Sequence, residues 1–137
     1  MNEVDFKAIR DEAFANINQN RPINIKGSDY DRNMIMTARE NAASLKLDDI
    51  FFFTKEVRKI EDLGEYGVII TNPPYGIRLS DETLDRTYEN FNSLIETIPT
   101  WSIYMITDYV IKDVIHREIN KNRKLYNGKI KTYFYTM

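Results

Sequence analysis

The segment Asn72-Pro73-Pro74-Tyr75 constrains the fold of this 137-residue chain more than any other stretch. It follows directly on the apolar run at residues 67–71, which predicts a strand. Two consecutive prolines lack amide donors and have a fixed φ, so they cannot extend that strand or enter a helix interior. The chain must therefore turn away at the carboxyl end of a strand, where open α/β sheets bind their ligands.

The prolines also limit what their neighbours can do. Pro73 favours an extended backbone at Asn72, so the Asn72 amide and the nearby carbonyls form a fixed set of donors and acceptors beside the flat ring of Tyr75. Such a set suits the exocyclic amine of a stacked planar base. The alternative is a rigid turn with an aromatic lid and no ligand.

The remaining sequence alternates between helical and strand patterns. Helical spacing predicts an amphipathic helix within residues 3–18, with an apolar stripe that needs a partner. Asp31 is a suitable cap for a second helix. Further helices are predicted over 81–98 and 110–115, strands over 23–29, 50–54, 67–71 and 101–107, and a hairpin over 123–135 that turns at Asn127-Gly128. This order predicts an α/β sheet with an antiparallel edge.

Composition excludes several classes of protein. No apolar stretch has the length of a membrane span, and the acidic start lacks the apolar core of a signal peptide. The absence of cysteine excludes disulfides, and a single histidine, His116, argues against a zinc site or a His-based triad. We therefore expect a single cytoplasmic domain that contacts no membrane and binds no metal.

Basic residues gather near the end of the chain, although the net charge is −2. Residues 112–131 contain seven Lys or Arg residues against two acids. Such a cluster can neutralise phosphates, but a run of charge is also typical of a solvated face.

Four segments, at residues 27–31, 38–42, 71–79 and 123–129, together resemble a known family. They look like the catalytic half of the THUMP-domain rRNA guanine-N2 methyltransferases, which are often named N6-adenine-specific DNA methylases. The resemblance covers roughly residues 20–137. It implies a class I S-adenosylmethionine-dependent methyltransferase sheet, which is Rossmann-like and has an antiparallel last strand.

The resemblance implies that the cofactor is S-adenosylmethionine and that three residues bind it. Asp29 matches the acid that hydrogen-bonds the ribose hydroxyls, with a purely capping role as the alternative. Glu56 falls where the family usually has an Asp that receives the adenine amino group. Asn72 borders the methyl donor.

The resemblance also assigns the catalytic set, which is Asn72, Pro73, Pro74 and Tyr75. Asn72 and the Pro73 carbonyl would accept hydrogen bonds from the target amine, while Tyr75 stacks on the base. Catalysis would then depend on positioning and charge, without a covalent nucleophile. The residues expected to contact nucleic acid are Tyr75, Arg78, Arg123 and Lys124, with a structural ion pair as the alternative for Arg78.

Family members carry a strand and a Gly-rich loop ahead of the Asp29 segment, whereas the glycines of this chain are scattered singly. In the class I strand order, that strand lies between the Asp29 strand and the Asn72 strand. We therefore expect a C-terminal fragment of the catalytic domain, with an N-terminal helix in residues 1–20 and the family-like region in 21–137. The two strands could pair directly, or the gap could be filled by a second copy or a complementing chain.

Three functions follow as hypotheses. The first is methylation of guanine N2 in 23S rRNA, which makes RNA the partner. The second is an N6-adenine DNA methylase, because the same tetrapeptide serves adenine amines. The third is a non-catalytic nucleic-acid-binding or assembly module that uses the basic tail.

Overall fold

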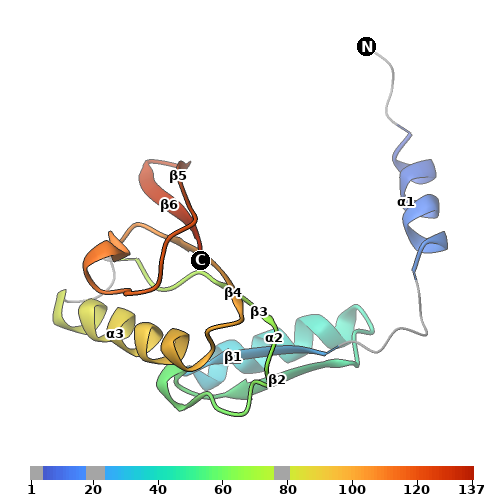
Figure 1. Ribbon diagram of the computed structural model, residues 1–137. Helices are drawn as coiled ribbons and strands as arrows, with labels where there is room; N and C mark the ends of the chain where they lie inside the picture. The colour runs from blue at the N-terminus through green and yellow to red at the C-terminus, as the bar shows by residue number, and fades with distance from the viewer. Residues whose placement is uncertain (1–4, 18–23, 76–80) are drawn as a thin grey trace.

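The computed structural model describes residues 5–17, 24–75 and 81–137 (Figure 1). It confirms an α/β fold in which helices and strands alternate before a terminal hairpin. The elements are α1 (Phe6–Ala15), β1 (Ile25–Asp29), α2 (Arg32–Ser44), β2 (Ile50–Thr54), the 3₁₀ turn η1 (Val57–Lys59), β3 (Val68–Thr71), α3 (Asp81–Thr97), β4 (Ser102–Thr107), the 3₁₀ turn η3 (Ile111–Asp113), β5 (Lys121–Asn127) and β6 (Ile130–Thr136).

The strands form two separate sheets. β1 pairs in parallel with β2, while the second sheet has the order β3-β4-β6-β5. In the second sheet β3 and β4 are parallel, and β6 runs antiparallel to both of its neighbours, as the sequence predicts. Direct pairing of β1 with β3, one of the expected ways to close the sheet, does not occur among the described residues.

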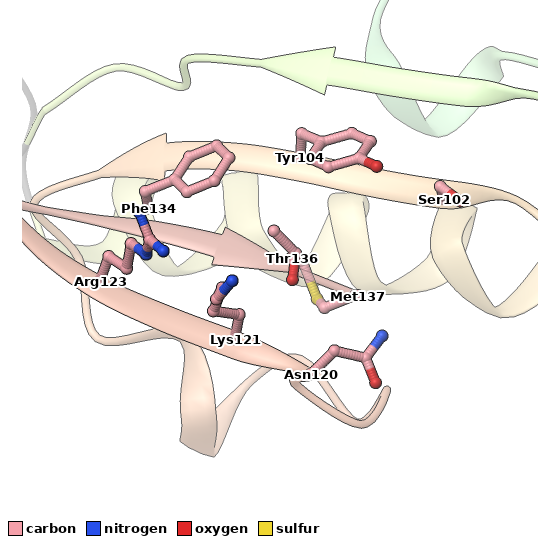
Figure 2. A pocket seen from close by; sticks show the side chains of 8 residues that line it. All are labelled: Ser102, Tyr104, Asn120, Lys121, Arg123, Phe134, Thr136 and Met137. Atoms are coloured by element: carbon pink, nitrogen blue, oxygen red, sulfur yellow. The ribbon is translucent and has the colours of Figure 1, made fainter.

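Helix α3 covers one face of the four-stranded sheet and forms the core with it. Its predicted apolar stripe is buried at Leu84, Tyr88, Leu94, Ile95 and Ile98. These side chains pack with alternate residues of the strands, namely Ile103, Met105 and Tyr135. The opposite face carries Tyr104 and Phe134, whose rings stack with centroids 6.3 Å apart beside a pocket of about 410 Å³ (Figure 2).

Two predicted elements differ from the structure. Where an α-helix was predicted over residues 110–115, the structure has the short turn η3 at Ile111–Asp113. Val110 ahead of the turn is extended, and Ile111 and Ile115 are buried against the core. The hairpin turn falls at Gly128-Lys129, one residue later than predicted, since Asn127 pairs with Ile130. Gly128 has a φ of +63°, which glycine adopts without steric cost.

Helix α1 lies apart from both sheets (Figure 1). The Asp5 carboxylate caps it by accepting hydrogen bonds from the amides of Lys7 and Ala8. None of its residues is buried, and Phe6 is 75% exposed. Its apolar stripe therefore has no partner within the part of the chain that the structure describes.

Candidate functional site

A cavity of about 510 Å³ lies between β1 and β3 and brings together most of the predicted site residues. One wall comes from the end of β1 and the segment after β2, and the other from β3 and α3. Five of the expected positions line it: Asp29, Glu56, Asn72, Pro73 and Pro74. The structure thus brings these five residues together around one cavity, although the two sheets that carry them are not paired.

Asp29 is the last residue of β1 and is held in a tight turn. Its Oδ1 accepts a hydrogen bond of 2.8 Å from the Asp31 amide, and its carbonyl accepts one of 2.9 Å from the Lys55 amide. The cap of α2 is instead Asp31, whose Oδ1 accepts from the Asn33 amide at 2.8 Å, as predicted. Because a carboxylate has two oxygens and about four lone-pair sites, Asp29 retains capacity to accept further hydrogen bonds.

Glu56 lies on the same wall but is engaged by its own chain neighbours. Its Oε2 is 2.6 Å from Arg58 Nε, and its Oε1 is 3.1 Å from Lys59 Nζ. These hydrogen bonds, that of Arg58 first, lower the pKa of the Glu56 carboxyl below its ordinary value. Glu56 is therefore an ionised acceptor that would have to share its oxygens with any bound amine.

The Asn72-Pro73-Pro74-Tyr75 segment begins directly after β3 ends at Thr71. Pro73 is buried, whereas Asn72 and Pro74 are exposed at the cavity. Tyr75 is half-buried and is not among the residues that line the cavity. Asn72 therefore lines the cavity, whereas Tyr75 lies outside its lining.

A cluster of hydroxyl groups beside this segment was not predicted. The buried Tyr88 hydroxyl shares a hydrogen bond with Thr107 Oγ1, which also accepts from the Tyr109 amide at 3.0 Å. Tyr109 in turn donates to Asp85 Oδ1 at 2.5 Å. The sequence held one signal that could have predicted this cluster. Thr107 ends β4, which is the parallel neighbour of β3, so the residues after Thr107 lie at the same sheet edge as Asn72.

Comparison with known proteins identifies the family. The model of the UPF0020 family, described as an RMKL-like methyltransferase domain, matches residues 1–135. The chain belongs to this family. Its fold is accordingly part of the α/β methyltransferase fold, with the antiparallel edge described above.

Relatives of this RMKL-like chain have been named for RNA methylation. The chain is 37% identical over 121 residues to the "Putative RNA methyltransferase YpsC" of Bacillus subtilis, covering 86% of this chain and 31% of that protein. It is 36% identical over 111 residues to the ribosomal RNA large subunit methyltransferase K/L of Aliivibrio fischeri, covering 76% of this chain and 16% of that protein. The chain therefore spans about a third or less of the length of these relatives.

A solved structure shows the same arrangement of elements. SMU.472, described as "a putative methyltransferase complexed with SAH", superposes on this RMKL-like chain with a TM-score of 0.87 and 31% sequence identity. The superposition covers 95% of this chain and 35% of that chain. Almost the whole RMKL-like chain thus follows the fold of a longer protein that binds a cofactor product.

The predicted nucleic-acid contacts do not form one group. Arg78 lies outside the described residues. Arg123 and Lys124 are neighbours on β5, so their side chains point to opposite faces of the sheet, and neither lines the cavity. Arg117, another member of the basic run, is structural, because its guanidinium donates to the carbonyls of Ile98, Pro99 and Trp101.

Residues 5–17, 24–75 and 81–137 contain no group of three His, Cys, Asp or Glu side chains that could hold a metal ion. Within the same ranges, no helix has the length and apolar character needed to cross a membrane.

Proposed function

We propose that this RMKL-like chain is the part of an S-adenosylmethionine-dependent RNA methyltransferase that holds the adenosine end of the cofactor and the amine to be methylated. The observation that carries the proposal is the single cavity shared by Asp29 of β1 and Asn72 after β3. SAH in the structure of SMU.472 and the names of the relatives support it.

The residues that line the cavity fit an adenosine group. Its volume of about 510 Å³ lies in the ordinary range for small-molecule sites, about 300–1,000 Å³. Asp29 supplies a carboxylate for a ribose diol, the device that dinucleotide folds use. Apolar side chains around it, Phe53, Val57 and Leu63, would border a planar base. When bound, the cofactor supplies an electrophilic methyl group on a sulfonium.

The chain's own contribution to the reaction is positioning. Pro73 and Pro74 fix the backbone after β3, so the Asn72 amide oxygen and the Pro73 carbonyl would accept hydrogen bonds from an exocyclic amine. These acceptors would orient the amine nitrogen toward the cavity and favour the positive charge that the nitrogen gains during transfer. Tyr75, which does not line the cavity, would stack on the target base.

The proposed target is guanine N2 of large-subunit ribosomal RNA. The name of the K/L relative supports ribosomal RNA as the substrate, and the four segments that resemble the guanine-N2 methyltransferases support the base. Methyl transfer to ribosomal RNA and not to DNA, measured with tritiated cofactor, tests this choice. Transfer to adenine in DNA would replace it with the second hypothesis.

Titration calorimetry with S-adenosylhomocysteine tests the cofactor site on this chain. We expect measurable binding, which Asp29→Asn weakens at least tenfold because the ribose loses a charged acceptor. Asp31→Asn is the matched control, since Asp31 caps α2 and Asn is also a good cap. The proposal fails if the wild-type chain gives no heat and its Asp29 amide shows no protection, or if both variants lose affinity equally.

A further inference from the structure

The tip of the β5–β6 hairpin carries an alternating array of cations and aromatic rings on one face. In the strand register Lys124 lies opposite Tyr133, and Tyr126 lies opposite Lys131. Lys124 Nζ is 5.6 Å from the centroid of the Tyr126 ring, and Lys131 Nζ is 5.3 Å from that of the Tyr133 ring. We call these four residues the Lys–Tyr array.

The array lies at the same sheet edge as the Asn72 segment. β6 is antiparallel to β4 and pairs Tyr133 with Thr107, the last residue of β4. The residues nearer the turn, Tyr126 and Lys131, therefore extend past the carboxyl end of β4. β6 and β5 are the second and third strands from β3, so strand spacing puts the array about 10–15 Å across the sheet from Asn72.

Three members of the array are open to solvent. Tyr126 is 67% exposed, and Lys124 and Lys131 are exposed beside it. Tyr133 is half-buried and packs against the core, which anchors the array to the sheet. A hydrogen bond with Tyr133 raises the pKa of Lys131, so Lys131 is charged at neutral pH.

We propose that the Lys–Tyr array binds a single-stranded nucleic-acid segment next to the target base, with Tyr126 stacking on a base and the two lysines contacting phosphates. Exposed rings between cations are the common design of single-strand binding surfaces. The inference rests on the proposed function, which makes the strand RNA. It extends that function by assigning a binding surface to residues away from the cavity.

The array also divides the basic tail. Lys121 and Arg123 occupy the opposite face of β5, beside the pocket lined by Tyr104 and Phe134 (Figure 2). Of the three basic residues expected to contact nucleic acid, Arg78 lies outside the described residues, Arg123 lies on the other face, and the array includes Lys124. Each face of the hairpin therefore carries one pair of cations on β5 and β6. Lys121 and Arg123 form the pair on one face, and they serve as a matched control for Lys124 and Lys131 on the other.

Fluorescence anisotropy with a labelled 12-nucleotide single-stranded RNA tests the inference on the chain as it stands. We expect Tyr126→Ala to weaken binding about fivefold or more, and Tyr126→Phe to restore it because the ring is retained. The slope of log K against log salt is negative, and the double variant K124Q/K131Q should make it less negative by about 1.4. The control K121Q/R123Q removes the same charge from the other face and should leave most of the affinity. Thermal melts confirm that each variant is folded.

Several results would overturn the inference. One is an equal loss of RNA affinity in the two double variants, and another is wild-type RNA affinity in Tyr126→Ala. A third is that the chain binds duplex RNA as tightly as single-stranded RNA. Single-stranded DNA of the same sequence is the second arm, and binding of DNA alone would overturn RNA as the ligand. Calorimetry with S-adenosylhomocysteine measures ligand binding at the cavity independently of the array. If S-adenosylhomocysteine still binds while the array variants leave RNA affinity unchanged, the array is rejected as an RNA-binding surface and the proposed function stands.

Discussion

The ring of Tyr109 stacks on the ring of Tyr88, with centroids 4.3 Å apart and planes 9° from parallel. The stack closes the core at the end of β4, where the Tyr88 hydroxyl bonds the buried hydroxyl of Thr107. It also lies at the sheet edge that carries the Asn72 segment, since Thr71 of β3 pairs with Met105, two residues before Thr107. Packing here therefore supports the proposed base-binding side of the site.

Replacing Tyr88 with Phe should lower the free energy of unfolding by about 1–3 kcal/mol, because the buried Thr107 hydroxyl loses a partner. Urea unfolding followed by circular dichroism measures the change. The matched control is Tyr126→Phe, which removes a hydroxyl from an exposed ring and should change stability by less than about 0.5 kcal/mol. Equal effects of the two variants would contradict the role given to the Tyr88–Thr107 bond.

Alkaline titration should show two tyrosines that ionise late. Burial raises the pKa of Tyr88 to about 12, and the hydrogen bond to the Asp85 carboxylate raises the pKa of Tyr109 to about 12. Both values exceed the ordinary tyrosine pKa of about 10, so the folded state favours the neutral phenols. Their contribution to stability is complete below pH 10 and is lost as the pH rises from 10 to 12.

The Asp85→Asn variant distinguishes the ionisation of Tyr109 from that of Tyr88. The variant removes the main cause of the Tyr109 shift, so the pKa of Tyr109 should fall toward 10 while that of Tyr88 stays near 12. Phenolate absorbance near 295 nm follows both ionisations. An unchanged titration curve in Asp85→Asn would show that the carboxylate does not set the Tyr109 pKa.

Gly67→Ala should destabilise the chain by about 1–3 kcal/mol, since a Cβ at this position would lie 2.4 Å from the indole of Trp101. The indole cannot withdraw easily, because its Nε1 donates to the Gly64 carbonyl at 3.1 Å. Tryptophan fluorescence during denaturation measures the effect. In a Trp101→Leu background the same alanine should cost less, and additive losses would contradict the clash.

The open edge of β3 should promote self-association. Ile70 is 83% exposed on a strand that is paired along one side among the described residues. We expect sedimentation velocity to show concentration-dependent association that Ile70→Lys suppresses. Val110→Lys, which makes the same change at an exposed residue outside the strands, should leave association intact. A monomer at every concentration would reject this prediction.

Replacing Glu56 with Asp should strengthen the binding of adenosine. The resemblance places an Asp at this position, and the shorter side chain would separate the carboxylate from Arg58 and Lys59, which now engage both of its oxygens. Calorimetry with adenosine measures the gain. Glu56→Gln keeps the length but removes the charge, so it should not reproduce the gain. Weaker binding in Glu56→Asp would show that the ion pairs position the carboxylate for the ligand.

Features fixed by local sequence were predictable. The α3 stripe follows from helical spacing, and the Asp31 cap follows from an acid just ahead of an amphipathic run. Asp29 ends a parallel strand and Asn72 directly follows one, and the carboxyl ends of such strands are where open α/β sheets bind ligands, although β1 and β3 belong to separate sheets. In each case the pattern lies within a few residues or follows a general rule of sheet topology.

Features that depend on tertiary contacts were not predictable. The ion pairs of Glu56 depend on the η1 turn, which brings Arg58 and Lys59 back to the carboxylate. The Tyr88–Tyr109 stack depends on how α3 packs on the end of β4. The hairpin turn moved by one residue because pairing of β5 with β6, and not the Asn-Gly dipeptide alone, sets the register.

The two walls of the candidate cavity differ in how much apolar surface holds them. Among the described residues of β1, α2 and β2, the buried apolar side chains are Ile35 and Ala42, whereas α3 and the four-stranded sheet share an extensive core. The Asp29 wall should therefore open at lower denaturant concentration than the Asn72 wall. A ligand that touches both walls would have to order the weaker one, so its affinity and the stability of β1 and β2 would rise or fall together.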